Sequence, residues 1–378
     1  MVPLVSSQRL SHLHLAAAVV VLAGCAASQT NAALGSEVAG ASLATGHWSV
    51  VATLPRMPSG LAQAADGRLF VACPQWVERG PTLFELVDGE LVPWPPSSAD
   101  AAPDSPAPVS VNGIHIDSAN RLWVVDNARV DLRAPTQPPE VFVYDLHTNA
   151  LLFHREFDAE VSTGAGVFFN DIAVFEELGV AVFSESGLGS DPALVVWDYV
   201  GDQQARWLAG HASVQAQPEH PVRVGDEAAQ VQTADGPRPW LIGLNGITRI
   251  GQTLYFGATS SETLWSLDVV QALQHEGQVE PVEATVERPL FDGIAATGTR
   301  VWMTDLQNLG LAWWDSQSGE AATLAGDIEF AVAVEPLADG SVLVSEGQFH
   351  RLPLLGPPDC STCEDRRQPP YRILRWTP

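Results

Sequence analysis

LNGITRIGQTLYFGATSSETLWSL, residues 244–267, has the pattern of three short β-strands joined by turns. It starts with the polar pair Asn245 and Gly246, and apolar and polar residues then alternate in three runs separated by turn residues. Alternation with period two indicates strands, and short turns between strands make them neighbours in an antiparallel meander. The segment therefore predicts one small antiparallel sheet.

The same pattern occurs five more times along the chain. Each copy has a polar or small residue, then glycine or a substitute, an aliphatic run, a turn and a second apolar run. The other copies start at Ser59, Asn112, Asn170, Asp292 and Phe330. One meander cannot bury both of its faces, whereas meanders repeated radially cover one another. We therefore predict an all-β fold, a single six-bladed β-propeller over residues 47–378.

Two further candidate strands lie outside these copies, near the two ends of the chain. Residues 48–54 precede the first copy, and residues 371–376 follow the last one. Propellers often close by combining strands from both termini in one blade. We expect the same closure here.

In a propeller, the first residue of each copy lies where the innermost strand begins, next to the central channel. Four consecutive copies begin with an amide or a carboxylate: Asn112, Asn170, Asn245 and Asp292. Such side chains also satisfy backbone groups in tight turns, which explains any one of them alone. For four such residues at equivalent positions, a shared binding site is as good an explanation as turn formation. We predict that these four residues bind a small molecule.

The chain is strongly acidic. It contains 45 acidic and 19 basic residues, for a formal net charge of −26, and every basic residue is arginine. An acidic surface repels phosphate backbones and attracts cations, so we expect no nucleic-acid partner. The absence of lysine excludes Schiff-base chemistry on a lysine. We expect a monomer.

Residues 1–25 have the features of an export signal. Arg9 precedes an apolar run that is too short to span a membrane, and the run ends in Leu22-Ala23-Gly24-Cys25. These four residues resemble a bacterial lipobox, which implies a lipid on Cys25. Ala26 then implies the outer rather than the inner membrane. A plain cleaved signal is the alternative. We expect residues 26–46 to be a flexible tether to the cell envelope, with no other membrane contact.

Three cysteines remain if Cys25 carries a lipid. Cys360 and Cys363 lie in the polar segment PPDCSTCEDRRQPP, and Cys73 follows a predicted strand. In an oxidising compartment we expect a disulfide between Cys360 and Cys363, with Cys73 as a small buried side chain. A zinc site would need two further ligands that the sequence does not place. The long segment 201–240 is a candidate lid over one face.

Several of these segments together resemble the major royal jelly protein and Yellow family. The segments that carry the resemblance include SGLAQAADGRLFVACPQW (59–76), IDSANRLWVVDNA (116–128), FFNDIAV (168–174), RWLAGHASV (206–214) and residues 244–267. Members of that family are secreted six-bladed propellers, and some bind biogenic amines in the central channel. The resemblance implies a small-molecule site on the propeller axis.

The strand starts also resemble those of the gluconolactonase/regucalcin and paraoxonase propellers, which hydrolyse lactones or esters. This resemblance implies Ca²⁺ ligands at Asn170, Asn245 and Asp292. Asp171 or Glu185 is then our own candidate for a catalytic base. Amide and carboxylate oxygens suit Ca²⁺, which can act as a Lewis acid.

Two residues depart from that second resemblance. Ser59 replaces the glutamate ligand of those families, and Asn112 replaces the paraoxonase-like histidine. His115 lies three residues after Asn112, so alternation predicts that it faces the other side and is packed. The sequence therefore favours a propeller that binds a small polar or cationic molecule in its channel. A Ca²⁺-dependent lactonase or esterase, and a purely structural protein, are the alternatives.

Overall fold

The computed structural model describes residues 46–76, 78–96, 106–130, 135–164, 166–188, 191–233, 235–284, 286, 288–352 and 365–378. All of them belong to one compact unit, Ala41–Pro378. The predicted signal, nearly all of the predicted tether, Cys25, Cys360 and Cys363 lie outside the described residues. Within the described part, Cys73 is a buried free thiol, and no helix is long and apolar enough to cross a membrane.

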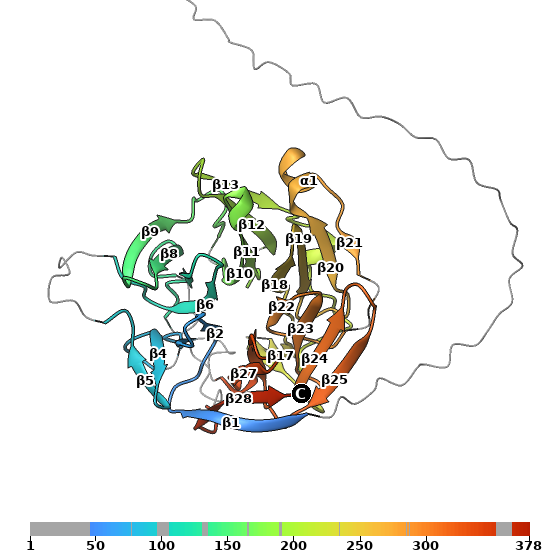
Figure 1. The fold of residues 1–378 in the computed structure, drawn as a ribbon. Coiled ribbons are helices and arrows are strands. Elements are labelled where there is room, and N and C mark those ends of the chain that lie inside the picture. The colour runs from blue at the N-terminus through green and yellow to red at the C-terminus, as the bar shows by residue number, and fades with distance from the viewer. Residues whose placement is uncertain are drawn as a thin grey trace, which may run out of the picture. The chain divides into compact units, whose positions relative to one another are not determined.

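Six four-stranded antiparallel sheets form a ring, which confirms the six-bladed β-propeller (Figure 1). From the innermost strand outward, blade 1 is β2 (Gly60–Gln63), β3 (Leu69–Ala72), β4 (Leu83–Val87) and β5 (Glu90–Pro93); blade 2 is β6 (Val111–Ile116), β7 (Arg121–Asp126), β8 (Glu140–Asp145) and β9 (Ala150–Glu156); blade 3 is β10 (Phe169–Phe175), β11 (Val180–Glu185), β12 (Ala193–Asp198) and β13 (Gln203–Trp207); blade 4 is β18 (Leu244–Ile250), β19 (Thr253–Ala258), β20 (Trp265–Asp268) and β21 (Val282–Glu283); blade 5 is β22 (Ile294–Thr297), β23 (Arg300–Asp305), β24 (Gly310–Asp315) and β25 (Ala321–Ala325); and blade 6 is β26 (Ala331–Pro336), β27 (Val342–Glu346), β28 (Tyr371–Thr377) and β1 (His47–Leu54).

The ring closes through both ends of the chain. In blade 6, the C-terminal strand β28 lies between β27 and the N-terminal strand β1. The antiparallel ladder of β1 and β28 runs from the pair His47 and Thr377 to the pair Leu54 and Tyr371. The predicted closure is therefore confirmed. The innermost strands β2, β6, β10, β18, β22 and β26 each contact the next one around the axis.

The shorter elements lie in the connections between strands, both within blades and between them. They are η1 (Glu176–Leu178), η2 (Ala212–Val214), the hairpin of β14 (Arg223–Val224) and β15 (Glu227–Ala228), the hairpin of β16 (Gln230–Thr233) and β17 (Gly236–Pro239), α1 (Val269–Gln274) and η3 (Phe349–Arg351). The two hairpins belong to segment 201–240. Val222 and Trp240, from this segment, pack in one apolar cluster with Trp76, Phe168 and Phe349 from three other loops.

A β-bulge interrupts four of the innermost strands at equivalent places. The register shifts between Val111 and Ile114, between Phe169 and Ile172, between Leu244 and Ile247, and between Ala331 and Val334. The two residues between each of these points have no partner in the ladder. Hydroxyl groups of the second strand accept hydrogen bonds from two of the freed backbone N–H groups. The N–H of Asp171 donates to Ser184 Oγ at 2.9 Å, and the N–H of Ala333 donates to Ser345 Oγ at 3.1 Å.

The bulges correct two predictions about side-chain positions. A bulge adds one residue between Asn112 and His115, so the two side chains no longer alternate in the predicted way. The sixth strand start is also two residues later than predicted, because the register makes Val332 the equivalent of Asn112. Phe330 precedes β26 and is fully buried in the core.

Candidate functional site

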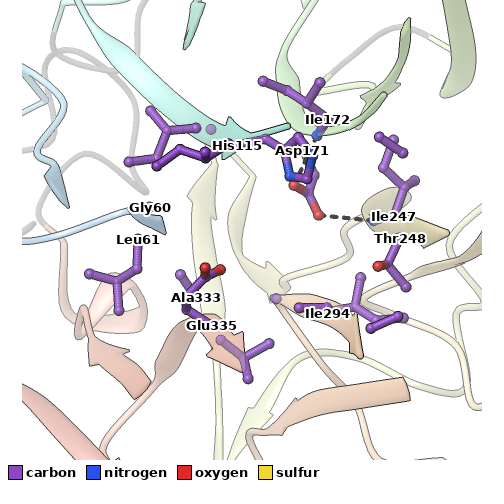
Figure 2. A pocket seen from close by; sticks show the side chains of 18 of the residues that line it. Gly60, Leu61, His115, Asp171, Ile172, Ile247, Thr248, Ile294, Ala333 and Glu335 are labelled. Carbon is purple, nitrogen blue, oxygen red and sulfur yellow. Dashed lines mark hydrogen bonds between the residues drawn. The ribbon is translucent and has the colours of Figure 1, made fainter. Parts of the chain in front are cut away.

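The innermost strands enclose a cavity of about 340 Å³ on the propeller axis, here called the axial cavity (Figure 2). All six blades contribute to its walls. The polar side chains that line it are those of Ser59, His115, Asp117, Ser118, Asn170, Asp171, Glu176, Thr248, Arg249, Asp292 and Glu335. Asn170 and Asp292, two of the four predicted ligand-binding residues, are therefore at this cavity.

Glycine follows the first residue of four strand starts because the next blade approaches closely there. A Cβ on Gly113 would lie 1.9 Å from the carbonyl oxygen of Asn170, and one on Gly293 would lie 2.2 Å from that of Val332. Blade 3 differs, since Asp171 occupies the equivalent position. Its carboxylate accepts hydrogen bonds from the backbone N–H groups of Ile172 at 2.9 Å and Ile247 at 3.0 Å. Asp171 thus places a carboxylate on the axis where four other blades have no side chain.

Three carboxyl groups line the axial cavity without a basic partner. The pKa of Asp171, Asp292 and Glu335 is raised to about 7 in each case; burial is the main cause, and the charge of Asp171 contributes for the other two. In the described part of the chain, none of the three forms an ion pair with an arginine or histidine; Glu335 accepts from the backbone N–H of Gln63 at 3.1 Å. Figure 2 shows Asp171 and Glu335 extending into the cavity from different blades.

The basic groups in the cavity wall do not neutralise these acids. The Arg249 guanidinium pairs with Glu176 and Glu177, both at 2.9 Å. Burial lowers the pKa of His115, which leaves its imidazole neutral near pH 7. His115 lines the cavity instead of being packed, so that prediction was wrong. The axial cavity therefore has an excess of negative charge.

A second, smaller cavity of about 80 Å³, here called the upper cavity, lies at the strand starts. Asn170 and Asp292 line both cavities, and Asn245 lines only the upper one. The rest of its wall comes from Trp76, Phe168, Ser186, Leu188, Trp240, Ile242, Phe349 and Leu352. Most of these residues belong to the apolar cluster that segment 201–240 completes. The upper cavity is thus mainly apolar, with its polar groups at the ring of strand starts.

Two hydrogen bonds join the predicted ligand-binding residues in pairs across blade boundaries. The Asn112 amide donates to Asn170 Oδ1, and the Asn245 amide donates to Asp292 Oδ1 at 2.6 Å and to Thr259 at 2.8 Å. Asn112 is buried and lines neither cavity, so it positions Asn170. The structure therefore brings all four residues together, three of them at a cavity wall.

Glu185, the other candidate base, lies away from both cavities. It is buried, pairs with Arg206 at 2.7 Å and accepts from the backbone N–H groups of Phe168 and Gly187. Its contacts stabilise the end of β11. Glu335 is the residue that sequence reasoning missed. It occupies in blade 6 the position that His115 occupies in blade 2, which becomes visible only after the bulges align the two strands.

The side chains at the strand starts do not fit a Ca²⁺ site. Ca²⁺ takes six to eight oxygen ligands, usually including several carboxylates, whereas Asp292 is the one acid among Asn170, Asn245 and Asp292, and its Oδ1 already accepts from Asn245. Ser59, where the calcium propellers carry glutamate, donates to the Asn112 carbonyl at 2.8 Å. Among the described residues, no three His, Cys, Asp or Glu side chains are grouped suitably for a metal ion.

The sequence profile of the major royal jelly protein family matches residues 109–320. No curated protein matches the chain. Among solved structures, the gluconolactonase of Xanthomonas campestris is 13% identical, with a TM-score of 0.51 over 88% of this chain and 89% of that one. The virginiamycin B lyase of Staphylococcus aureus is 12% identical, with a TM-score of 0.50 over 88% and 100%. The regucalcin of Agrobacterium tumefaciens is 13% identical, with a TM-score of 0.49 over 86% and 93%. At these identities the likeness shows the fold alone.

Proposed function

The chain belongs to the major royal jelly protein family, and from this premise we propose that it is an exported, lipid-anchored propeller that binds a small organic cation in its axial cavity. One observation carries the proposal. Asp171, Asp292 and Glu335 line one cavity, and within the described residues no basic side chain pairs with them. A bound cation would supply the missing positive charge.

The energetics favour a cation over a neutral molecule. A carboxylate that is removed from water without a counter-charge is destabilised, and it responds by holding a proton near pH 7. A cation in the cavity removes that penalty, because opposite charges attract strongly where water is scarce. The backbone N–H groups that hold the carboxylates fix their position before the ligand arrives. Little reorganisation then accompanies binding.

The affinity for a permanently charged cation should rise with pH. Carboxyl groups with a pKa of about 7 are mostly protonated at pH 6 and ionised at pH 8. Calorimetry with tetramethylammonium, whose own charge is constant, should show an association constant at pH 8 that is at least tenfold above that at pH 6. Burial lowers the pKa of the His115 imidazole, and a rise in pH can only remove positive charge from it, which does not oppose the trend.

Neutral tert-butanol is the matched control, because it is similar in size and uncharged. It should bind at neither pH, and a panel of amines, catechols and sugars extends the comparison. If no cation bound more tightly than millimolar at pH 8, the proposal would be wrong. The ligand-free protein should show the opposite trend in stability. The native state holds more protons than the unfolded state between about pH 4 and 7, so the free energy of unfolding should fall as pH rises through this window.

A chelator experiment distinguishes the proposed cation site from the alternative, a Ca²⁺-dependent lactonase or esterase. Because Asp292 is the single acid among the three suggested ligands, we expect EDTA to leave the melting temperature of the purified protein unchanged. Added Ca²⁺ should likewise have no effect, and metal analysis should find less than one equivalent. A chelator-sensitive melting temperature that Ca²⁺ restores, and that Asp292→Ala abolishes, would favour the hydrolase instead.

Export and lipid anchoring rest on the sequence around Cys25 alone. Labelling of cells with a radioactive fatty acid tests them. The label should enter the wild-type protein, and it should be absent when Cys25 is replaced with serine.

A further inference from the structure

Two buried polar groups in the wall of the upper cavity have no hydrogen-bond partner among the described residues. They are the indole Nε1–H of Trp76, a residue only 4% exposed, and the hydroxyl of Ser186, which is 2% exposed. A buried donor without an acceptor is costly, and native proteins rarely tolerate two in one place without a ligand or ordered water. The upper cavity therefore has two donors available for an acceptor atom that is not part of the protein.

The remaining wall limits what such a molecule can be. Phe168, Trp240, Ile242 and Phe349 make most of the wall apolar. The volume of about 80 Å³ is roughly half that of a cavity that accepts benzene, about 150 Å³. An aromatic ring is therefore too large, whereas a chain of a few heavy atoms with one oxygen fits.

The upper cavity and the axial cavity share two lining residues at the ring of strand starts. Asn170 and Asp292 line both of them. Asn170 accepts a hydrogen bond from Asn112, and Asp292 accepts one from Asn245. Within the described part of the chain, no hydrogen bond joins one pair to the other. A slender group that passed between the two pairs would leave both hydrogen bonds intact.

We propose that the cation bound in the axial cavity carries a short uncharged arm with an oxygen acceptor, and that this arm lies in the upper cavity. The oxygen accepts hydrogen bonds from Trp76 Nε1–H and from the Ser186 hydroxyl, while the apolar wall surrounds the carbon atoms. This inference rests on the proposed function, because the positive charge of the same molecule lies near Asp171 and Glu335. It defines the ligand class as alkylammonium ethers, esters or related oxygenated cations.

Two cations that differ in one atom test the arm directly. Methoxyethyltrimethylammonium has an ether oxygen where butyltrimethylammonium has a methylene group, and both have the same length and charge. Calorimetry on the intact protein at pH 8 should show that the ether binds roughly three- to tenfold more tightly, the effect of about one neutral hydrogen bond. Phenethyltrimethylammonium, whose ring exceeds the cavity, should bind no more tightly than tetramethylammonium.

The variants Trp76→Phe and Ser186→Ala remove the two donors; Ser186→Ala does so with little change in shape, whereas Trp76→Phe also removes the part of the ring that carries Nε1. In the double variant the preference for the ether should fall to about one. Trp94→Phe is the matched control, because Trp94 also has a buried, unpartnered Nε1 but packs between Phe70 and Tyr144, away from both cavities. That control should keep the full preference.

The possible outcomes separate the two proposals. If both cations bind equally well to the wild-type protein, the arm proposal is wrong and the cation site stands, with ordered water occupying the upper cavity. A preference that persists in the double variant also overturns the arm proposal. If neither cation nor tetramethylammonium binds, both proposals fail together.

Discussion

A chain that ends at Pro370 should fail to fold. The truncation removes β28, which pairs with β27 on one side and with β1 on the other. It also removes Tyr371, Ile373, Leu374 and Trp376, each at most 4% exposed. Burial of one such side chain contributes about 1.5–3 kcal/mol, and the whole stability of a domain is typically about 5–15 kcal/mol. The stabilisation lost with these four side chains is therefore comparable with the total free energy of unfolding.

Circular dichroism and thermal melting of the purified protein check this expectation. The truncated chain should show no cooperative unfolding transition, or should be recovered only as aggregate. A chain that ends at Trp376 is the control, since it lacks only Thr377 and Pro378, both exposed. A wild-type melting curve for the chain that ends at Pro370 would show that the ring does not depend on closure by both termini.

Replacing Asp171 with glycine should weaken tetramethylammonium binding by about 30-fold or more at pH 8. A charge that is partly buried beside its counter-ion contributes about 2 kcal/mol or more to affinity. Glycine is compatible with the backbone there, because Gly60, Gly113, Gly246 and Gly293 occupy the equivalent position in four other blades. The substitution removes an unpaired buried charge, but it also removes the acceptor of the Ile172 and Ile247 N–H groups. We therefore expect a melting temperature at pH 8 close to the wild-type value.

Two further variants test whether the charge of Asp171 itself or the overall acidity of the chain is responsible for cation binding. Asp171→Asn keeps the size of the side chain and should lose binding to a similar extent. Glu90→Gln changes the net charge by the same amount on the exposed outer strand β5, and it should bind as the wild-type protein does. Equal losses in Asp171→Gly and Glu90→Gln would mean that long-range attraction, and not the axial cavity, holds the cation.

The fold was predictable because it repeats. Residues 244–267 specify one meander, and five similar segments leave few arrangements other than a ring of blades. The closing strands were predictable for the same reason, since an apolar alternating segment at each end had no other partner. Local patterns of this kind depend on residues that are close in the sequence, so they can be recognised without knowledge of tertiary contacts.

The site was less predictable because bulges change which way side chains point. Alternation predicted a packed position for His115, which instead lines the axial cavity, and it gave no reason to connect Glu335 with the channel. A bulge depends on the contacts of the whole strand, so a pattern of residues does not reveal it reliably. The upper cavity was beyond prediction for another reason. Its wall combines Trp76, Phe168, Trp240 and Phe349, which come from four loops far apart in the sequence.

The bulges also allow the residues at the axis to change while the pairing of the strands stays the same. In four innermost strands, the two residues at the bulge form no rung of the ladder, so their identity is not fixed by strand pairing. Blade 2 carries Asn112 and Gly113 there, blade 3 carries Asn170 and Asp171, and blade 6 carries Val332 and Ala333. One unchanged scaffold therefore accommodates an amide, an acid or an aliphatic side chain at its axis. Point mutations at bulge positions that the next blade does not crowd can therefore change the ligand while every blade keeps its register.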